Sequence, residues 1–90
     1  MDRTAFTLML ENEGYQTFVD VERGPHDVQG LHTHPFEARA LILKGELRLM
    51  VGDHEQLCRA GDQFHLAAHT PHLETCGADG VHYLAGRKPG

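Results

Sequence analysis

The sequence is short of the residues that mark disulfide-rich, nucleic-acid-binding and membrane proteins. Its two cysteines, Cys58 and Cys76, are too few for a disulfide framework, so we expect buried, reduced thiols. Lysine and arginine number 8 against 13 acidic residues, and the formal charge of −5 argues against nucleic-acid binding. No apolar run approaches the roughly 20 residues that cross a bilayer, and no signal-peptide cleavage site follows the N-terminus. We expect a soluble, cytoplasmic protein that binds neither nucleic acid nor membrane.

Ninety residues allow one domain with a small core, because a chain this short buries only about two-thirds of its unfolded surface. The 10 glycines interrupt the chain at short intervals, which is typical of short strands joined by turns. We expect a single domain over residues 1–90, with a helical segment over 1–14, a β-barrel over 15–86 and a basic, mobile tail over 87–90. A homodimer would cover exposed strand edges and add to the small core.

Apolar residues between Thr4 and Glu13 recur at helical spacing. Asp2 or Thr4 can cap the start of such a helix, and Gly14 stands where a left-handed residue ends one. A first strand is the alternative, because T-A-F-T-L alternates loosely. We expect a short helix that packs on the outside of the domain.

The rest of the chain alternates between apolar and polar residues in short runs separated by Gly, Pro and Asp. Several short strands with frequent turns predict an all-β sandwich or a small barrel. The expected strands are Tyr15–Glu22, Val28–His34, Glu37–Leu43, Glu46–Val51, His54–Arg59, Gln63–Leu66, His72–Cys76 and Val81–Ala85.

Two histidines that stand two apart, His32 and His34, mark the most informative stretch of the chain. In a strand, residues at this spacing point to the same face, so both imidazoles aim at one point. Imidazole is the commonest protein ligand of transition metals. With 8 histidines in 90 residues, a chance pair that is solvated before Pro35 is the alternative.

The pattern around these histidines resembles that of the cupin superfamily, whose members are small jelly-roll barrels. The first cupin motif reads G-x5-H-x-H-x3/4-E-x6-G, and the second reads G-x5-P-x-G-x2-H-x3-N. Here the H-T-H at 32–34 is followed by Gly45 at the family's distance, and Gly61 is followed by His72 at the family's distance. The resemblance spans Gly30–Cys76. It implies an all-β fold, a small cupin jelly-roll barrel, to which the sequence adds a short N-terminal helix.

The sequence also departs from the family's motifs. Ala38 stands at the position of the family's glutamate, and Glu37 comes one residue early. In the second motif Pro-x-Gly is replaced by Ala67-Ala68-His69, and the final Asn is Cys76. The fourth ligand is therefore missing or displaced. Three metal-ligand positions match residue by residue: His32, His34 and His72.

Three inward-facing histidines with open coordination positions suit Fe, Zn, Ni, Mn, Co or Cu, and the sequence does not select among them. Neutral imidazoles leave the +2 charge of the metal in place, which would attract an anionic ligand or lower the pKa of bound water. Glu37 is a candidate fourth ligand if a bulge at Pro35 turns it inward; otherwise it faces solvent or pairs with Arg39. Glu74 shares a face with His72, and could be a ligand, a general base, a partner of a ligand or a rim carboxylate.

Three further residues are candidates for the pocket beside the histidines. His69 could add a nitrogen near the metal or cap its loop. Arg39 could hold a substrate carboxylate, contact a second subunit or be solvated. Phe36 is either core or part of the pocket mouth.

The resemblance implies a metal-dependent enzyme that acts on a small molecule, anionic if the charge at the metal selects it. The reaction would be of the dioxygenase, isomerase or lyase type. The first alternative is a non-catalytic module that binds or senses a metal or a small ligand. The second is a structural dimer that keeps the fold and leaves the histidines empty.

Overall fold

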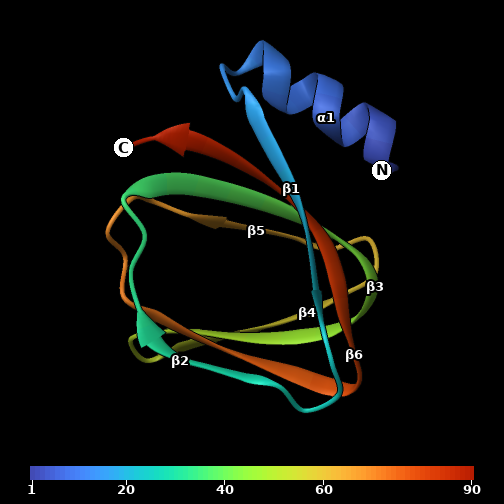
Figure 1. The fold of residues 1–90 in the computed structure, drawn as a ribbon, viewed down its shortest axis with the longest axis vertical. Coiled ribbons are helices and arrows are strands. Elements are labelled where there is room, and N and C mark those ends of the chain that lie inside the picture. The colour runs from blue at the N-terminus through green and yellow to red at the C-terminus, as the bar shows by residue number, and fades with distance from the viewer.

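One N-terminal helix and six antiparallel strands make up the computed structural model, which describes all 90 residues (Figure 1). The predicted all-β barrel with a short helix is confirmed. The elements are α1 (Arg3–Asn12), β1 (Thr17–Arg23), β2 (Val28–His32), β3 (Phe36–Val51), β4 (His54–Arg59), β5 (Gln63–Leu66) and β6 (His72–Pro89).

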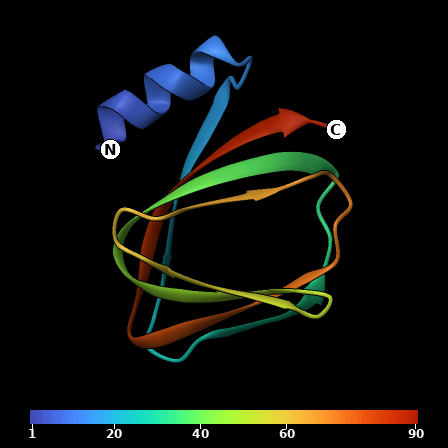
Figure 2. The same ribbon diagram turned by 180° about the vertical axis from the view of Figure 1, so that it is seen from behind.

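Two strands, β3 and β6, run through both walls of the barrel. The first part of β3 pairs with β5 and with the end of β6, which also pairs with β1. The later part of β3 pairs with β4 and with the start of β6, which also pairs with β2. Figures 1 and 2 show these two groups of strands as opposite walls, with α1 lying outside the barrel beyond the first of them.

Both long strands bend in the gaps between the predicted strands, at Lys44-Gly45 and at residues 77–80, and their pairing resumes beyond the bends after shifts of register. Gly45 and Gly80 have φ values of 80° and 72°, a region that side chains disfavour. A Cβ atom at Gly45 would overlap the carbonyl oxygen of Gly80. The two glycines thus let β3 and β6 turn the same corner in contact, where the sequence predicted two separate strands for each.

The predicted mobile tail over 87–90 is wrong, because β6 continues to Pro89 and pairs with Phe36. Lys88 donates a hydrogen bond of 2.8 Å from Nζ to the carbonyl oxygen of Glu13, at the end of α1. Ladder pairing and this contact fix the end of the chain against the barrel.

The predicted helix is confirmed, with its start capped by Asp2. The carboxylate of Asp2 accepts a hydrogen bond of 2.8 Å from the backbone N–H of Ala5, and Gly14, with φ of 94°, follows the helix end. Phe6 and Leu10 are completely buried between the helix and the barrel. They pack with Tyr15, Leu41 and Leu84.

The main core lies between the two walls, away from α1. Cys58 and Cys76 are buried there as free thiols, as predicted, and burial raises the pKa of Cys58 to about 11. The other members of this core are Ala40, Ile42, Leu47, Leu49, Phe64, Leu66, Val81, Tyr83 and Ala85.

The helix α1 lacks the length and hydropathy needed to cross a membrane.

Candidate metal centre

Three histidines from two strands and one loop meet at the end of the barrel cavity. His32 is the last residue of β2 and pairs in the ladder with His72, the first residue of β6. His34 lies in the connection to β3, because β2 ends at His32 and not at the predicted residue 34. One ligand nitrogen from each ring lies within 4.8 Å of the others. The structure therefore brings together the three histidines that the motifs predict.

Backbone carbonyls orient two of the three rings. Nδ1 of His72 lies 2.8 Å from the carbonyl oxygen of Thr70, and Nδ1 of His32 lies 2.5 Å from that of Gly30. A carbonyl can only accept a hydrogen bond, so each Nδ1 carries a proton, and in the neutral imidazole Nε2 then presents a lone pair. Nε2 of His72 is buried and has no hydrogen-bond partner. A metal ion would satisfy such a nitrogen, and its backbone partner would hold the ring in place.

His34 is held by an aromatic stack. Its ring lies 4.8 Å from that of Phe36, at an interplanar angle of 15°. Burial, followed by the charges of His32 and His72, lowers the pKa of His34 below its ordinary value. The neutral imidazole that binds metals is therefore favoured.

Glu74 reaches the same point from β6, where only 5% of the residue is exposed. Its Oε2 lies 3.6 Å from Nε2 of His32 and 3.6 Å from Nε2 of His72. Its Oε1 accepts a hydrogen bond of 3.1 Å from the hydroxyl of Tyr83. With metal–ligand bonds of about 2.0–2.2 Å, tetrahedral ligand atoms lie about 3.3–3.6 Å apart. The two distances from Glu74 match this spacing, whereas the histidine nitrogens, which lie within 4.8 Å of one another, would have to draw closer to share one ion.

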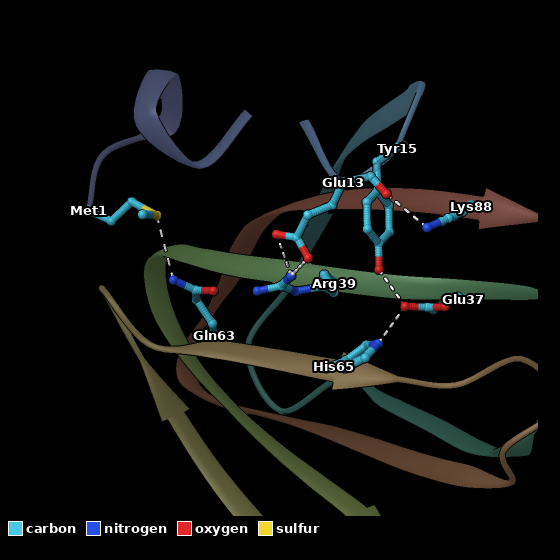
Figure 3. A network of polar contacts seen from close by, with 8 residues as sticks. All are labelled: Met1, Glu13, Tyr15, Glu37, Arg39, Gln63, His65 and Lys88. Atoms are coloured by element: carbon cyan, nitrogen blue, oxygen red, sulfur yellow. Dashed lines mark hydrogen bonds and ion pairs between the residues drawn. The ribbon is translucent and has the colours of Figure 1, made fainter. Parts of the chain in front are cut away.

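Glu37 is not brought to the histidines. Its carboxylate accepts a hydrogen bond of 2.6 Å from the hydroxyl of Tyr15 and lies 2.7 Å from Nε2 of His65 (Figure 3). Strand β3 begins at Phe36 without a bulge that would turn Glu37 inward, so the alternation of the strand sends Ala38 to the cavity and Glu37 outward. The hydrogen bonds from Tyr15 and His65 lower the pKa of Glu37. The expectation of Glu37 as a ligand has no support in this geometry.

Two of the three expected pocket residues also lie elsewhere. Arg39 is on the outer face of β3 and donates to both carboxylate oxygens of Glu13, at 2.8 and 3.0 Å (Figure 3). His69 is exposed with φ of 64°, and its backbone N–H donates to the carbonyl oxygen of His34 at 2.7 Å. His69 therefore serves the loop, one of the two roles considered for it. Phe36 does line the cavity.

The cavity beside the histidines has a volume of about 140 Å³ and contains two arginines that the sequence reasoning missed. Arg23 lies one residue beyond the predicted strand Tyr15–Glu22, but it ends β1 and shares the inward face of that strand with Val21. A charge on an inward face is a signal of function. Arg87 was assigned to the tail. Both line the cavity together with Glu74 and Tyr83.

The fold and the motifs agree with known proteins. A family model described as a cupin domain matches residues 19–80. An RmlC-like cupin from Shewanella frigidimarina is 20% identical at a TM-score of 0.70, over 82% of this chain and 66% of that chain. KdgF from Halomonas sp. is 18% identical at a TM-score of 0.67, over 78% of this chain and 67% of that one. No curated protein is significantly similar to the sequence.

A third similar structure is the oxalate decarboxylase of Bacillus subtilis, which has Mn(II) centres. It is 22% identical at a TM-score of 0.74, and the match covers 81% of this chain but only 21% of the decarboxylase. This chain thus corresponds to about a fifth of that enzyme. Likenesses at this identity show a shared fold, while the family model covers more than half of the sequence. The chain belongs to the cupin family.

Proposed function

We propose that this protein is a metal-dependent enzyme for a small molecule, with one divalent transition metal bound by His32, His34, His72 and Glu74. The observation that carries the proposal is the buried, unpartnered Nε2 of His72, which faces a carboxylate and two further imidazoles. An unsatisfied buried nitrogen costs free energy, and bound metal removes that cost.

Glu74 takes the role that the family's first motif gives to a glutamate on the neighbouring strand. Ala38 stands at the motif position and lines the cavity without a ligand atom. The carboxylate of Glu74 enters from β6 instead, and the hydroxyl of Tyr83 holds it from behind. The displaced fourth ligand of the motif is thereby replaced from a different strand.

A metal in this position would act as a Lewis acid or as a centre for oxygen chemistry. The chain's own residues orient the imidazoles through the carbonyl oxygens of Gly30 and Thr70. The apolar side chains of Phe36 and Phe64 line the cavity and limit water around a bound molecule. We expect a dioxygenase, isomerase or lyase reaction, with the metal drawn from Fe, Zn, Ni, Mn, Co and Cu. The Mn(II) centres of the similar decarboxylase support manganese as one of these.

The second candidate is a non-catalytic module that binds or senses a metal or a small ligand. The buried position of Glu74 favours it, because a fourth protein ligand leaves fewer open positions on the metal. It predicts that metal and small molecules bind without turnover, both in air and without oxygen.

Elemental analysis tests the metal site. Untagged protein, purified without nickel resin or chelator, is expected to carry a single metal equivalent per chain, and His72→Ala to carry none. Glu74→Gln is expected to bind metal more weakly. His65→Ala is the matched control, because His65 also contacts a carboxylate but lies outside the barrel.

Circular dichroism of each variant separates loss of metal from loss of fold. Full metal occupancy in folded His72→Ala contradicts the proposal. So does a parent protein that takes up no metal after anaerobic reconstitution with each of the six candidates.

The homodimer that the sequence predicts is part of the same proposal. Strand β4 forms one edge of the sheet, and β4 has no further strand on its outer side. Light scattering at micromolar concentration is expected to give twice the chain mass, and a monomer contradicts the prediction.

A further inference from the structure

Two buried side-chain polar atoms in this protein have no hydrogen-bond partner, and both belong to residues of the same cavity. One is Nε2 of His72, which the proposed metal explains. The other is Nε of Arg23, which a metal ion does not explain, because a guanidinium only donates hydrogen bonds. Buried polar groups nearly always have partners. The unpaired donor of Arg23 therefore indicates an acceptor that comes from outside the chain.

The pairing of the arginines singles out the same cavity. Four of the six form ion pairs with acidic side chains: Arg3, Arg39, Arg48 and Arg59. The two that form no ion pair are Arg23 and Arg87, and these are the two that line the cavity. In a chain with 13 acidic residues and 8 basic ones, two unpaired guanidinium groups in one cavity are unexpected unless an anion joins them.

The backbone of Arg23 is fixed at the corner of the barrel. Arg23 is the last residue of β1 and pairs with Val81, and its carbonyl oxygen lies so close to Gly80 that a Cβ there would overlap it. The backbone therefore sets the position of Arg23, and no internal partner of its Nε draws the side chain elsewhere.

Arg87 is held over an aromatic ring. The central carbon of its guanidinium lies 4.6 Å from the ring centroid of Phe36, and the same ring stacks on that of His34. Stacking of this kind leaves the N–H donors at the rim of the guanidinium plane free to bind an anion. Arg87 is thus placed beside the proposed metal ligands with its donors available.

The charges in the cavity are unbalanced. Its ionisable residues are the three histidines, Tyr83, Glu74 and the two arginines. With neutral histidines and tyrosine, two positive charges face the single negative charge of Glu74. A bound divalent metal adds two more. The cavity is therefore electropositive with or without metal, and an anion would restore the balance.

We propose that the cavity binds a small carboxylate, with Arg23 and Arg87 as the residues that recognise it. The inference rests on the proposed function, since it assigns the class of molecule that the metal site acts on. A planar guanidinium matches the two oxygens of a carboxylate with parallel hydrogen bonds. The cavity of about 140 Å³ and its apolar wall of Phe36, Val21 and Ala85 restrict the ligand to a compact organic acid.

Calorimetric titration tests this with acetate, pyruvate, malonate and succinate, using the protein as purified with its metal and again after chelation. Malonamide is the uncharged counterpart, and inorganic phosphate tests for a different anion. At least one carboxylate is expected to bind both forms of the protein, while malonamide does not bind. Arg23→Gln and Arg87→Gln are each expected to weaken binding roughly tenfold or more, the effect of losing a charged hydrogen bond.

Arg48→Gln is the matched control, because Arg48 pairs with Glu55 on the surface and should leave the affinity unchanged. Metal content is measured in every variant and is expected to stay constant. If Arg23→Gln does not fold, Arg23→Lys, which keeps the charge and loses the guanidinium fork, must show the loss of affinity.

Four results overturn the inference: no carboxylate binds, malonamide binds as well, phosphate binds more tightly than every carboxylate, or the arginine variants bind like the parent. Each can occur while the metal stays in place, which would leave the proposed metal site intact. Conversely, a protein that takes up no metal on reconstitution but binds carboxylates through Arg23 and Arg87 would refute the metal site and retain this inference.

Discussion

Replacing Tyr83 with phenylalanine removes one oxygen atom from behind the proposed metal centre and leaves the packing in place. The ring of Tyr83 contacts Phe64 at a centroid distance of 5.4 Å, a contact that phenylalanine keeps. The lost group is the hydroxyl that donates to Oε1 of Glu74 at 3.1 Å. Because Glu74 is only 5% exposed, water does not readily replace this donor.

Two effects of Tyr83→Phe follow from this geometry. A hydrogen bond to a buried carboxylate contributes about 1.5–3 kcal/mol, so the metal-free protein should lose about that much unfolding free energy. A residue that orients a metal ligand typically changes metal affinity by about 10–100-fold, so binding should weaken by that factor. Chemical denaturation measures the first effect, and competition with a chelator measures the second.

Tyr15→Phe is the matched control for Tyr83→Phe. Tyr15 also donates to a carboxylate, Glu37, at 2.6 Å, but on the outside of the barrel. Since Glu37 is more exposed, the cost should be only about 0.5–1.5 kcal/mol, with unchanged metal affinity. Equal metal affinity in Tyr83→Phe and the parent would refute the role given to Glu74. So would an equal loss in both variants.

Three further predictions concern the frame around the site. Gly52→Ala should lower the unfolding free energy by about 1–2 kcal/mol, the strain of a side chain in the left-handed region. Gly45→Ala should lower it further, because a Cβ at residue 45 also meets the Gly80 carbonyl. Equal losses in chemical denaturation would contradict the contact at the corner. Glu37 has a lowered pKa, so its stabilising effect is complete above about pH 4.3, the value of a free glutamate, and is lost as the pH falls through its lower folded-state value. The stability gap between the parent and Glu37→Gln should therefore shrink below about pH 4, and a gap that stays constant in acid titration argues against it. His69→Gly should keep full metal content by elemental analysis and change stability by less than about 1 kcal/mol, because relief at a φ of 64° is offset by the freedom of glycine; lost metal would return His69 to the site.

The histidine motifs predicted the cluster of His32, His34 and His72, because pairing between strands brings residues at fixed sequence positions together. His32 and His72 are neighbours in the sheet, so two local patterns were enough to place them together. The fourth ligand was harder, since Glu37 and Glu74 both stood near histidines in the sequence. They differ in whether the side chain faces the cavity. For Glu37 this depends on which alternate residues of β3 point inward, and therefore on where the strand begins after Pro35.

The arginines could not be predicted from local pattern. Arg87 follows a run of strand residues but precedes Pro89 and Gly90, which are typical of a chain end. Its place in the ladder comes from pairing with Ala38, a residue far away in the sequence. The continuity of β3 and β6 was missed for the same reason, because glycines that allow a shared bend read locally as turns.

Strand β6 supplies several of the polar residues that line the cavity, and this has a consequence for biosynthesis. His72 and Glu74 lie at the start of β6, whereas Tyr83 and Arg87 lie towards its end. Strand β6 also pairs with β1, β2 and β3, so much of the barrel cannot form until β6 has been synthesised. A ribosome must therefore release nearly all of these 90 residues before the proposed metal and anion ligands can come together. Of the three proposed histidine ligands, nascent chains halted before residue 72 would present only His32 and His34.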